Sequence, residues 1–259
     1  MVNKVNFRLH SKEKLAEFVW DLRNSFPKEN LKERNDNPCI HMSFSKNLIK
    51  KMLKSKKLNL QLKKEIVQEI KISTMEKEEI RDFIKKFREF WTSKVKDVFF
   101  TEIKNCFDKK YIQQKYICYP TKKVTGAYFG KNEITAIFEY RKSKLNKFKF
   151  ASVVLAEEIL HLVYWELWQK IYRRKIKDID EIFDIKGKKW SCWHVAEVLP
   201  EYILIQNKKF RKLNWHKDNR SKGYPWIPSL KKFLDPLWKN SENVEEFIIE
   251  AHKKLGINP

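Results

Sequence analysis

The sequence lacks paired cysteines, and this absence excludes two classes of small protein. Its 4 cysteines, spread over 259 residues, form no C-x-x-C pair. Such isolated cysteines argue against a zinc ribbon and against a disulfide framework. They favour a reducing, intracellular setting, so we expect a cytoplasmic protein. The cysteines are Cys39, Cys106, Cys118 and Cys192.

The sequence also lacks an apolar leader and any long apolar run free of charge. Residues 1–14 have no apolar core of the kind that a signal peptide needs, and the apolar run 148–168 contains too many charged side chains for a membrane span. No internal repeat or low-complexity linker interrupts the chain. Because 42% of the residues are hydrophobic and 14% aromatic, the chain has ample material for a core. We therefore exclude a disordered chain and expect a soluble protein.

Acidic residues are few compared with basic ones. The chain has 56 Lys and Arg against 33 Asp and Glu, a formal net charge of +23. Such an excess is typical of proteins that bind nucleic acid or an anionic membrane surface. It is equally typical of the lysine-rich, glycine-poor composition of A+T-rich genomes. The lysines are spread over the whole chain, which favours the compositional explanation and leaves nucleic acid as an alternative partner.

Hydrophobic spacing predicts mainly helices, with one group of strands. β-Branched and aromatic residues between 111 and 140, with turns at Gly126 and at 130–132, predict strands in antiparallel pairing. The predicted fold class is α+β, mainly α, with a small mixed sheet. We expect a helical region over residues 1–110 and a second region over residues 111–259, within one compact unit. Helical periodicity covers 11–24, 45–107, 150–172, 192–206 and 244–255.

Three of these helices have boundary or break signals. Ser11 is a predicted N-cap of the first helix and Ser241 of the last one, which Gly256 is expected to end. Pro200, inside the helix 192–206, predicts a kink or a new first turn because proline has no backbone N–H. The aromatic stripe that includes Phe83 and Phe87 follows the helical period, so we expect it in the core.

Three ionisable side chains stand close together in the apolar run 148–168. Glu157 and His161 are four residues apart, and Glu158 and His161 are three apart, so on a helix all three project from the same side. Apolar residues surround them, which predicts a helix buried all round. Because buried charges without partners are costly, we expect a metal ion, a counter-ion or a shifted pKa at this place.

The stretch Glu157-Glu158-Ile159-Leu160-His161 resembles the H-E-x-x-H motif of the zincin metallopeptidases, with glutamate in place of the first histidine. The resemblance implies that Glu157 and His161 are zinc ligands and that Glu158 is the catalytic general base. Carboxylates do ligate zinc, so the substitution is compatible with a metal site. It is equally compatible with a fold that has lost its metal.

In glutamate-type zincins a later helix supplies the third ligand, and the resemblance assigns this role to Glu197, 36 residues after His161. Glu201, four residues further on, would orient a ligand histidine. The family also implies an extended substrate paired with the strand before the helix, here residues 134–140.

The same resemblance implies a donor to the oxyanion after the third ligand, for which His216 and Tyr224 are candidates. No spacing rule fixes either residue, so a loop side chain that packs on the surface is the favoured alternative for both.

Other arrangements stay open for the cluster. His194, three residues before Glu197, is an alternative ligand in place of the missing histidine. Di-iron bundles use paired Glu-x-x-His motifs, which Glu158 and His161 match but His194 and Glu197 reverse, so this interpretation ranks below the zincin one. In a metal-free arrangement, a lysine or arginine would neutralise Glu157 within a buried hydrogen-bonded network.

The sequence-based hypothesis is therefore a zincin-like, zinc-dependent hydrolase that acts on a peptide or protein. Two alternatives come from other classes: an inactive peptide-binding module on the same fold, and a basic nucleic-acid-binding protein.

Overall fold

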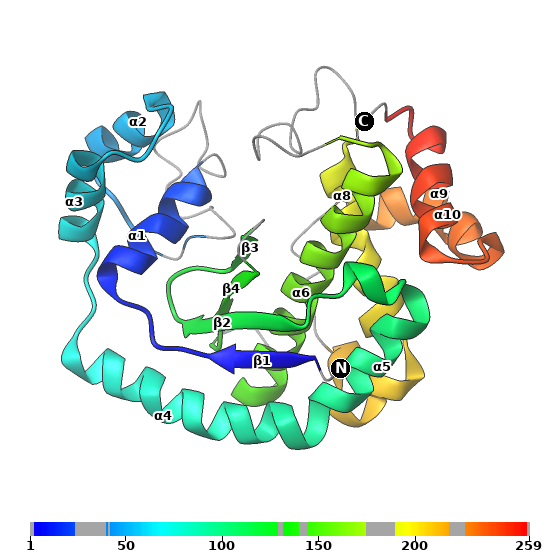
Figure 1. Cartoon of the computed structure of the whole chain (residues 1–259), viewed down its shortest axis with the longest axis horizontal. Helices are drawn as coiled ribbons and strands as arrows, with labels where there is room; N and C mark the ends of the chain where they lie inside the picture. Colours follow the sequence, from blue (N-terminus) through cyan, green and yellow to red (C-terminus); the bar gives the residue numbers. More distant parts are fainter. Residues whose placement is uncertain are drawn as a thin grey trace. The chain divides into compact units, whose positions relative to one another are not determined.

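A computed structural model describes residues 3–23, 40, 42–128, 132–139, 145–174, 190–217 and 226–257 (Figure 1). The chain forms two compact units. Unit 1 contains Met1–Asn3, Trp91–Gln114 and Tyr140–Pro259, and unit 2 contains Lys4–Phe90 and Lys115–Glu139. The chain passes between these units more than once.

The described residues are mainly helical with one small mixed sheet, which confirms the predicted α+β, mainly α class. Unit 2 holds the sheet, whose strand order is β1-β2-β4-β3. The pairs β1–β2 and β2–β4 are parallel, and β3–β4 is antiparallel. The strands are β1 (Lys4–Phe7), β2 (Lys115–Thr121), β3 (Gly126–Tyr128) and β4 (Glu133–Ile137).

The predicted antiparallel pairing is right for β3 with β4 and wrong for β2 with β4. The chain reverses twice, once on each side of β3, so β4 runs in the direction of β2 and pairs with it, Cys118 opposite Ile134. The prediction considered only the strands between 111 and 140. It did not include β1, which adds a parallel partner on the other side of β2.

The strand before the long helix is not an edge strand, which corrects the expectation for residues 134–140. β4 lies between β2 and β3, and the backbone N–H of Ile137 donates to Thr125 Oγ1 at 3.1 Å. The sheet edges are β1 and β3. Because both sides of β4 are paired over Glu133–Thr135, an added peptide strand has no free backbone groups there. Tyr140 lies outside the described residues.

Among the described residues, unit 2 has four helices. Side-chain caps begin the first three, and the fourth packs through aromatic side chains. Ser11 Oγ accepts a hydrogen bond from Lys14 N at 3.1 Å, so Ser11 is the N-cap predicted. Phe83 stacks on Phe138 at a centroid distance of 4.2 Å, and Phe87 is fully buried, so this stripe is core as predicted. The helices are α1 (Lys12–Asp21), α2 (Lys46–Lys54), α3 (Leu60–Glu69) and α4 (Thr74–Phe90).

Unit 1 is built around α6 (Lys147–Ile171), whose N-cap Asn146 accepts from Lys149 N at 3.0 Å. Most residues of α6 are buried, on every side of the helix, as the apolar sequence predicts. α6 packs against α8 (Cys192–Pro200) and α10 (Val244–Lys254). The other helices among the described residues of unit 1 are η3 (Trp91–Val95), α5 (Lys96–Cys106), η4 (Lys109–Tyr111), η5 (Glu201–Ile205), η6 (Lys208–Leu213), η7 (Trp215–Lys217) and α9 (Ile227–Asn240).

The expected irregularity at Pro200 is present. α8 ends at Pro200 and continues as the π-helix η5, in which Gln206 N donates to Glu201 O at 3.0 Å. Proline cannot donate to the preceding turn, and the shift to wider hydrogen bonding accommodates this loss. Among the described residues, every helix is too short or too polar to span a bilayer.

The last helix ends as predicted but begins at another cap. Gly256 has φ of 64°, the left-handed conformation that ends a helix. Asn243 Oδ1, and not Ser241, accepts the N-terminal hydrogen bond of α10, from Glu246 N at 2.9 Å. Ser241 instead ends α9, where its hydroxyl donates to Leu237 O at 2.8 Å.

Candidate functional site

The structure brings together two of the predicted ligands, His161 on α6 and Glu197 on α8. His161 Nε2 lies 3.5 Å from Glu197 Oε1. The side chains are 14% and 18% exposed, so both are largely shielded but reachable from solvent. The packing of α6 against α8 thus joins residues that are 36 positions apart in the sequence.

The distance between His161 Nε2 and Glu197 Oε1 can be compared with that of a hydrogen bond and with that of two ligands of one zinc ion. At 3.5 Å it exceeds the usual N–H···O separation of about 2.7–3.2 Å. Two ligands of a tetrahedral zinc ion, each about 2.0–2.2 Å from the metal, stand about 3.3–3.6 Å apart. The observed separation is compatible with two ligands of one ion.

His161 is in the protonation state that metal binding needs. Burial lowers the pKa of His161 to about 4, so its imidazole is neutral at neutral pH. A neutral imidazole has a lone pair on one ring nitrogen, which is the form that coordinates metals.

The other two members of the motif differ in burial. Glu158 is 8% exposed, and Glu157 is half-buried. Among the described residues, no three His, Cys, Asp or Glu side chains are gathered closely enough to hold a metal together. The structure therefore brings together His161 and Glu197 but does not add Glu157 to them as a third ligand.

The His194 side chain caps the start of α8 through hydrogen bonds with Ser191. Its Nδ1 accepts a hydrogen bond from Ser191 N at 3.1 Å and lies 2.9 Å from Ser191 Oγ, which ties the start of α8. The ring lies among Trp190, Trp193 and Trp226, at centroid distances of 5.4, 5.1 and 4.7 Å. Burial lowers the pKa of His194 to about 4. With Nδ1 engaged by a backbone N–H, His194 acts as a helix cap, which disfavours the alternative ligand set.

The remaining candidates are Glu201, His216 and Tyr224. Glu201 is half-buried and begins η5, directly after Pro200. His216 is exposed, and Tyr224 lies outside the described residues. Trp215, which precedes His216 in the sequence, is fully buried. Its Nε1 donates to Ser152 Oγ on α6 at 3.0 Å.

Sequence reasoning missed a buried chain of polar groups that joins α6, α8 and α10. Tyr172 Oη lies 2.7 Å from His252 Nδ1, and His252 Nε2 lies 3.1 Å from Tyr164 Oη. The Tyr164 hydroxyl donates to the carbonyl oxygen of Cys192 at 3.0 Å. Tyr164 Oη must then accept from His252 Nε2–H, so Nδ1 is the acceptor for the Tyr172 hydroxyl. His252 is therefore neutral and bonded at both ring nitrogens.

The pKa shifts of this chain of groups follow from its burial. Burial lowers the pKa of His252 to about 3 and raises the pKa of Tyr172 to about 12. His252 stands in the last turn of α10, where basic residues usually face solvent and stabilise the helix end. In the sequence, the pair Tyr164 and Tyr172 could have indicated such a partner. Tyr164 lies on α6, and Tyr172, eight residues later, is the C-cap of the same helix.

Replacing Tyr172 by Phe is expected to lower the free energy of unfolding by about 1–3 kcal/mol, because His252 Nδ1 is left buried without a donor. Tyr111→Phe is the matched control. The Tyr111 hydroxyl is buried and has no hydrogen-bond partner among the described residues, so its loss should change stability by less than about 0.5 kcal/mol. Urea unfolding of both variants measures the difference. Equal stabilities of the two variants would contradict the assigned hydrogen bonds.

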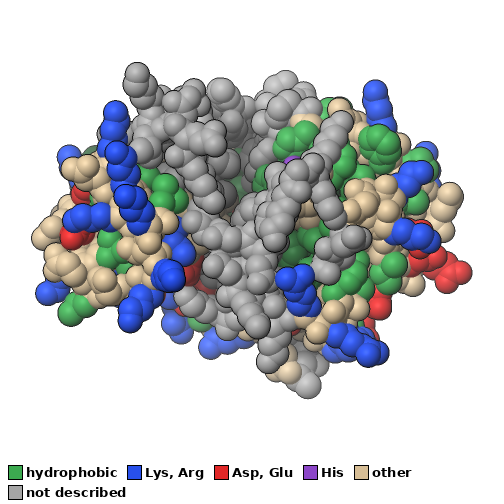
Figure 2. Space-filling view, turned by 90° about the horizontal axis from the view of Figure 1, so that it is seen from above, with side chains coloured by type: hydrophobic (Ala, Val, Ile, Leu, Met, Phe, Trp, Pro, Cys, Tyr) green, Lys and Arg blue, Asp and Glu red, His purple; other side chains and the backbone are tan. Residues whose placement is uncertain are grey.

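The Lys and Arg side chains of the described residues are distributed over several parts of the chain. Figure 2 shows Lys and Arg side chains at several separate positions on the face in view. Several lysines are also paired, as in Lys51–Glu65 at 2.8 Å and Lys63–Glu17 at 2.7 Å. The origin of the +23 charge stays a sequence-based expectation.

Comparison with protein-family models, with curated proteins and with solved structures gives no match to this chain. The function of the chain is therefore inferred from its residues and their geometry.

Proposed function

We propose that this chain is a zincin-like, zinc-dependent hydrolase whose metal ion is held between α6 and α8. The observation that carries the proposal is the 3.5 Å separation of His161 Nε2 and Glu197 Oε1. Two supporting features are the neutral state of His161 and the partial burial of both side chains. The resemblance to the zincin motif assigns the same two residues to one site independently of their distance.

The donor set fits zinc in kind. Zinc in proteins takes imidazole nitrogen and carboxylate oxygen ligands, which His161 and Glu197 provide. Glu157, one helical turn before His161, would supply a third ligand from the same side of α6. A rotation of its side chain would be needed, since no three-ligand group is preformed among the described residues.

Glu158 would accept a proton from the attacking water. It stands three residues before His161 on α6, which puts it on the same side of the helix, and it is 8% exposed. From there the carboxylate would accept the proton and deliver it to the leaving group. The chemistry that zinc supplies to such a site is polarisation of the scissile carbonyl and activation of water.

We propose a peptide or protein substrate because of the resemblance to the zincins. The sheet gives this proposal no support. The internal position of β4 removes the strand edge on which an extended substrate would add. Peptide binding would therefore depend on side chains near α6 and α8. Trp193 is one candidate, because it precedes Glu197 by four residues and so shares its side of α8.

Glu158→Gln tests the catalytic step of this proposal. We expect zinc-dependent hydrolysis of a fluorescein-labelled, unfolded polypeptide to fall by about 10²–10⁴-fold, because the amide cannot accept the proton. Zinc affinity should stay unchanged. Glu166→Gln is the matched control, since Glu166 lies on the same helix outside the motif, and it should keep parental activity.

Two results would overturn the hydrolase proposal. One is full activity in Glu158→Gln, and the other is a parent protein that binds zinc but hydrolyses no polypeptide.

A further inference from the structure

Helix α2 of unit 2 carries charge of one sign on its solvent side. Its nine residues include four lysines and no acidic residue. Because Leu48, Ile49 and Met52 are buried in the core of the unit, the lysines lie on the opposite side, and all four are exposed. Two further exposed lysines follow in the turn after α2. We call these six residues the lysine face: Lys46, Lys50, Lys51, Lys54, Lys56 and Lys57.

The lysine face follows the period of the helix. Lys46, Lys50 and Lys54 are each four residues apart, so their side chains form a row with steps of ~6 Å along the helix axis. Asn47 is also exposed and lies between this row and Lys51 on the helix surface. The exposed residues of α2 are therefore lysines and one asparagine.

Most ammonium groups of the lysine face have no carboxylate partner. Lys51 Nζ pairs with Glu65 Oε2 of α3 at 2.8 Å. Glu69, the other acid of α3, accepts hydrogen bonds from Ser45 N and Ser45 Oγ at 2.6 and 2.5 Å. Among the described residues, the other five lysines of the face have no ion-pair partner.

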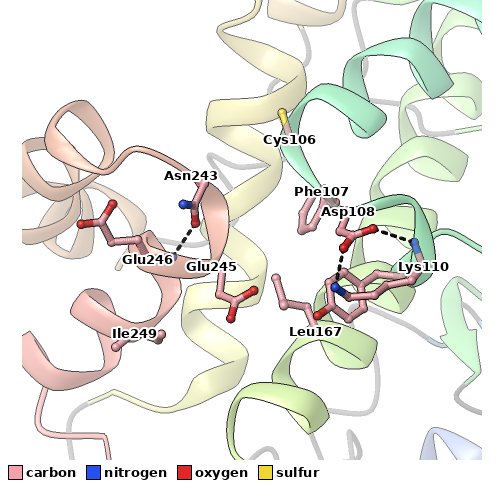
Figure 3. Close-up of a pocket in the computed structure, with 10 residues that line it drawn as sticks. Cys106, Phe107, Asp108, Lys110, Leu167, Asn243, Glu245, Glu246 and Ile249 are labelled. Carbon is pink, nitrogen blue, oxygen red and sulfur yellow. Dashed lines mark hydrogen bonds and ion pairs between the residues drawn. The ribbon is translucent and has the colours of Figure 1, made fainter.

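Lysines in other parts of the chain are paired. Figure 3 shows Lys110 with Asp108, in the lining of a cavity of unit 1. Within unit 2, Lys122 Nζ lies 2.7 Å from Glu79 Oε1. Such pairs cancel charge locally, whereas the lysine face keeps its positive charge and attracts anions.

The side chains of the lysine face favour a duplex as the polyanion that binds there. Residues 46–57 include no aromatic side chain on which unpaired bases would stack. The apolar side chains of α2 face the core, and Leu60, 70% exposed at the start of α3, is a single leucine, which gives only weak insertion into lipid. A duplex, in contrast, carries one negative charge per ~1.7 Å of its axis.

The dimensions of α2 favour DNA among duplexes. A helix with its side chains is about 10–12 Å in diameter, and the major groove of B-form DNA is about 12 Å wide. The major groove of duplex RNA is too narrow for side chains to read. Asn47, in the middle of the exposed side, has an amide that can hydrogen-bond to base edges in such a groove.

We propose that the lysine face of α2 binds the phosphate backbone of double-stranded DNA. α2 lies along the major groove, and the row Lys46, Lys50 and Lys54 contacts phosphates on one side of it. Because most of the affinity comes from phosphates, binding depends little on sequence. The surface belongs to unit 2 and does not depend on the proposed zinc site.

Fluorescence anisotropy of a labelled DNA duplex of arbitrary sequence, titrated with the full chain, tests the proposal. We expect a Kd of about 1–100 µM at physiological salt. The affinity should fall by about 10²–10³-fold between about 50 and 200 mM salt, as for the release of roughly five counterions. A single strand of the same length should bind more weakly, because its charge density is lower.

Two triple variants assign the binding to α2. The variant Lys46→Gln, Lys50→Gln, Lys54→Gln should bind the duplex about 10-fold or more weakly, and its slope of log affinity against log salt should be smaller by about three. The matched control removes the same charge from three exposed lysines elsewhere in unit 2: Lys71→Gln, Lys85→Gln and Lys86→Gln. It should bind as the parent does. Thermal unfolding should give the same melting temperature for the parent and both variants.

The proposal is overturned if the parent binds no duplex at low salt, if both triple variants weaken binding equally, or if the single strand binds as tightly as the duplex. Vesicles of phosphatidylcholine and phosphatidylserine provide the remaining comparison. Binding to these vesicles through Lys46, Lys50 and Lys54, without binding to the duplex, would assign the lysine face to a membrane surface and would also overturn the proposal.

Discussion

Lowering the pH from 7 to 5 is expected to remove several kcal/mol from the free energy of unfolding. Three histidines of unit 1 have a pKa far below the usual value near 6.5: burial lowers it to about 4 for His161, about 4 for His194 and about 3 for His252. In the folded chain they stay neutral down to these values, whereas in the unfolded chain they take up protons near pH 6.5.

The sign and size of this change in the free energy of unfolding follow from the difference in bound protons between the unfolded and the folded chain. Each histidine stabilises the folded state fully above pH 6.5, and this contribution falls as the pH drops from 6.5 toward the folded pKa. Near pH 5 the unfolded chain binds up to three more protons than the folded chain. The free energy of unfolding then falls by up to about 4 kcal/mol per pH unit. Domains are stable by only about 5–15 kcal/mol, so acid of this strength should bring the protein close to unfolding.

Urea unfolding at pH 7, 6 and 5, followed by tryptophan fluorescence, measures this slope. His252→Gln should reduce the slope by about one proton, or ~1.4 kcal/mol per pH unit. His216→Gln removes an exposed histidine and should leave the slope unchanged. A free energy of unfolding that is constant between pH 7 and 5 would show that these histidines are not held neutral by burial.

Glu157→His is expected to raise zinc affinity by about 10-fold or more. The proposed ligands Glu157, His161 and Glu197 comprise two carboxylates and one imidazole, a set that suits harder cations such as Mn²⁺ better than the usual two histidines and one glutamate. A second imidazole restores the H-E-x-x-H pattern and exchanges one oxygen donor for a nitrogen donor. The preference for Zn²⁺ over Mn²⁺ should therefore increase.

Competition against a chromophoric chelator measures both affinities in the parent and the variant. Glu166→His adds a histidine to the same helix away from the motif, and it controls for non-specific metal binding by a new imidazole. If Glu157→His and Glu166→His raise zinc affinity equally, Glu157 is not at the metal site.

Sequence reasoning predicted the two site helices because their signal is local. α6 is apolar on all sides, and α8 repeats this character around Glu197, so both had to be buried together. His161 and Glu197 lie on these two helices, and their side chains are 3.5 Å apart. The capping role of His194 comes from Ser191, three residues before it, whereas the packing of its ring also involves Trp226, which lies 32 residues further along the chain.

The sheet order and the polar contacts of His252 could not be predicted in the same way. β4 is internal because β2 pairs with it in parallel on one side and β3 pairs with it antiparallel on the other, while β1, from the first residues of the chain, pairs with the far side of β2. Such pairings depend on contacts between distant segments rather than on local patterns. His252 meets Tyr164 and Tyr172, which are 88 and 80 residues away in the sequence, and its own helix alone suggests a solvated position.

The zinc content of the purified protein decides whether a metal ion lies between α6 and α8. The parent chain and the variants His161→Ala, Glu197→Ala and His216→Ala are equilibrated with a small excess of zinc, desalted and analysed by inductively coupled plasma mass spectrometry. We expect about one zinc per chain in the parent and in His216→Ala, and none in His161→Ala and Glu197→Ala. A parent that retains no zinc and has the same thermal stability with and without the metal would show that His161 and Glu197 form no zinc site.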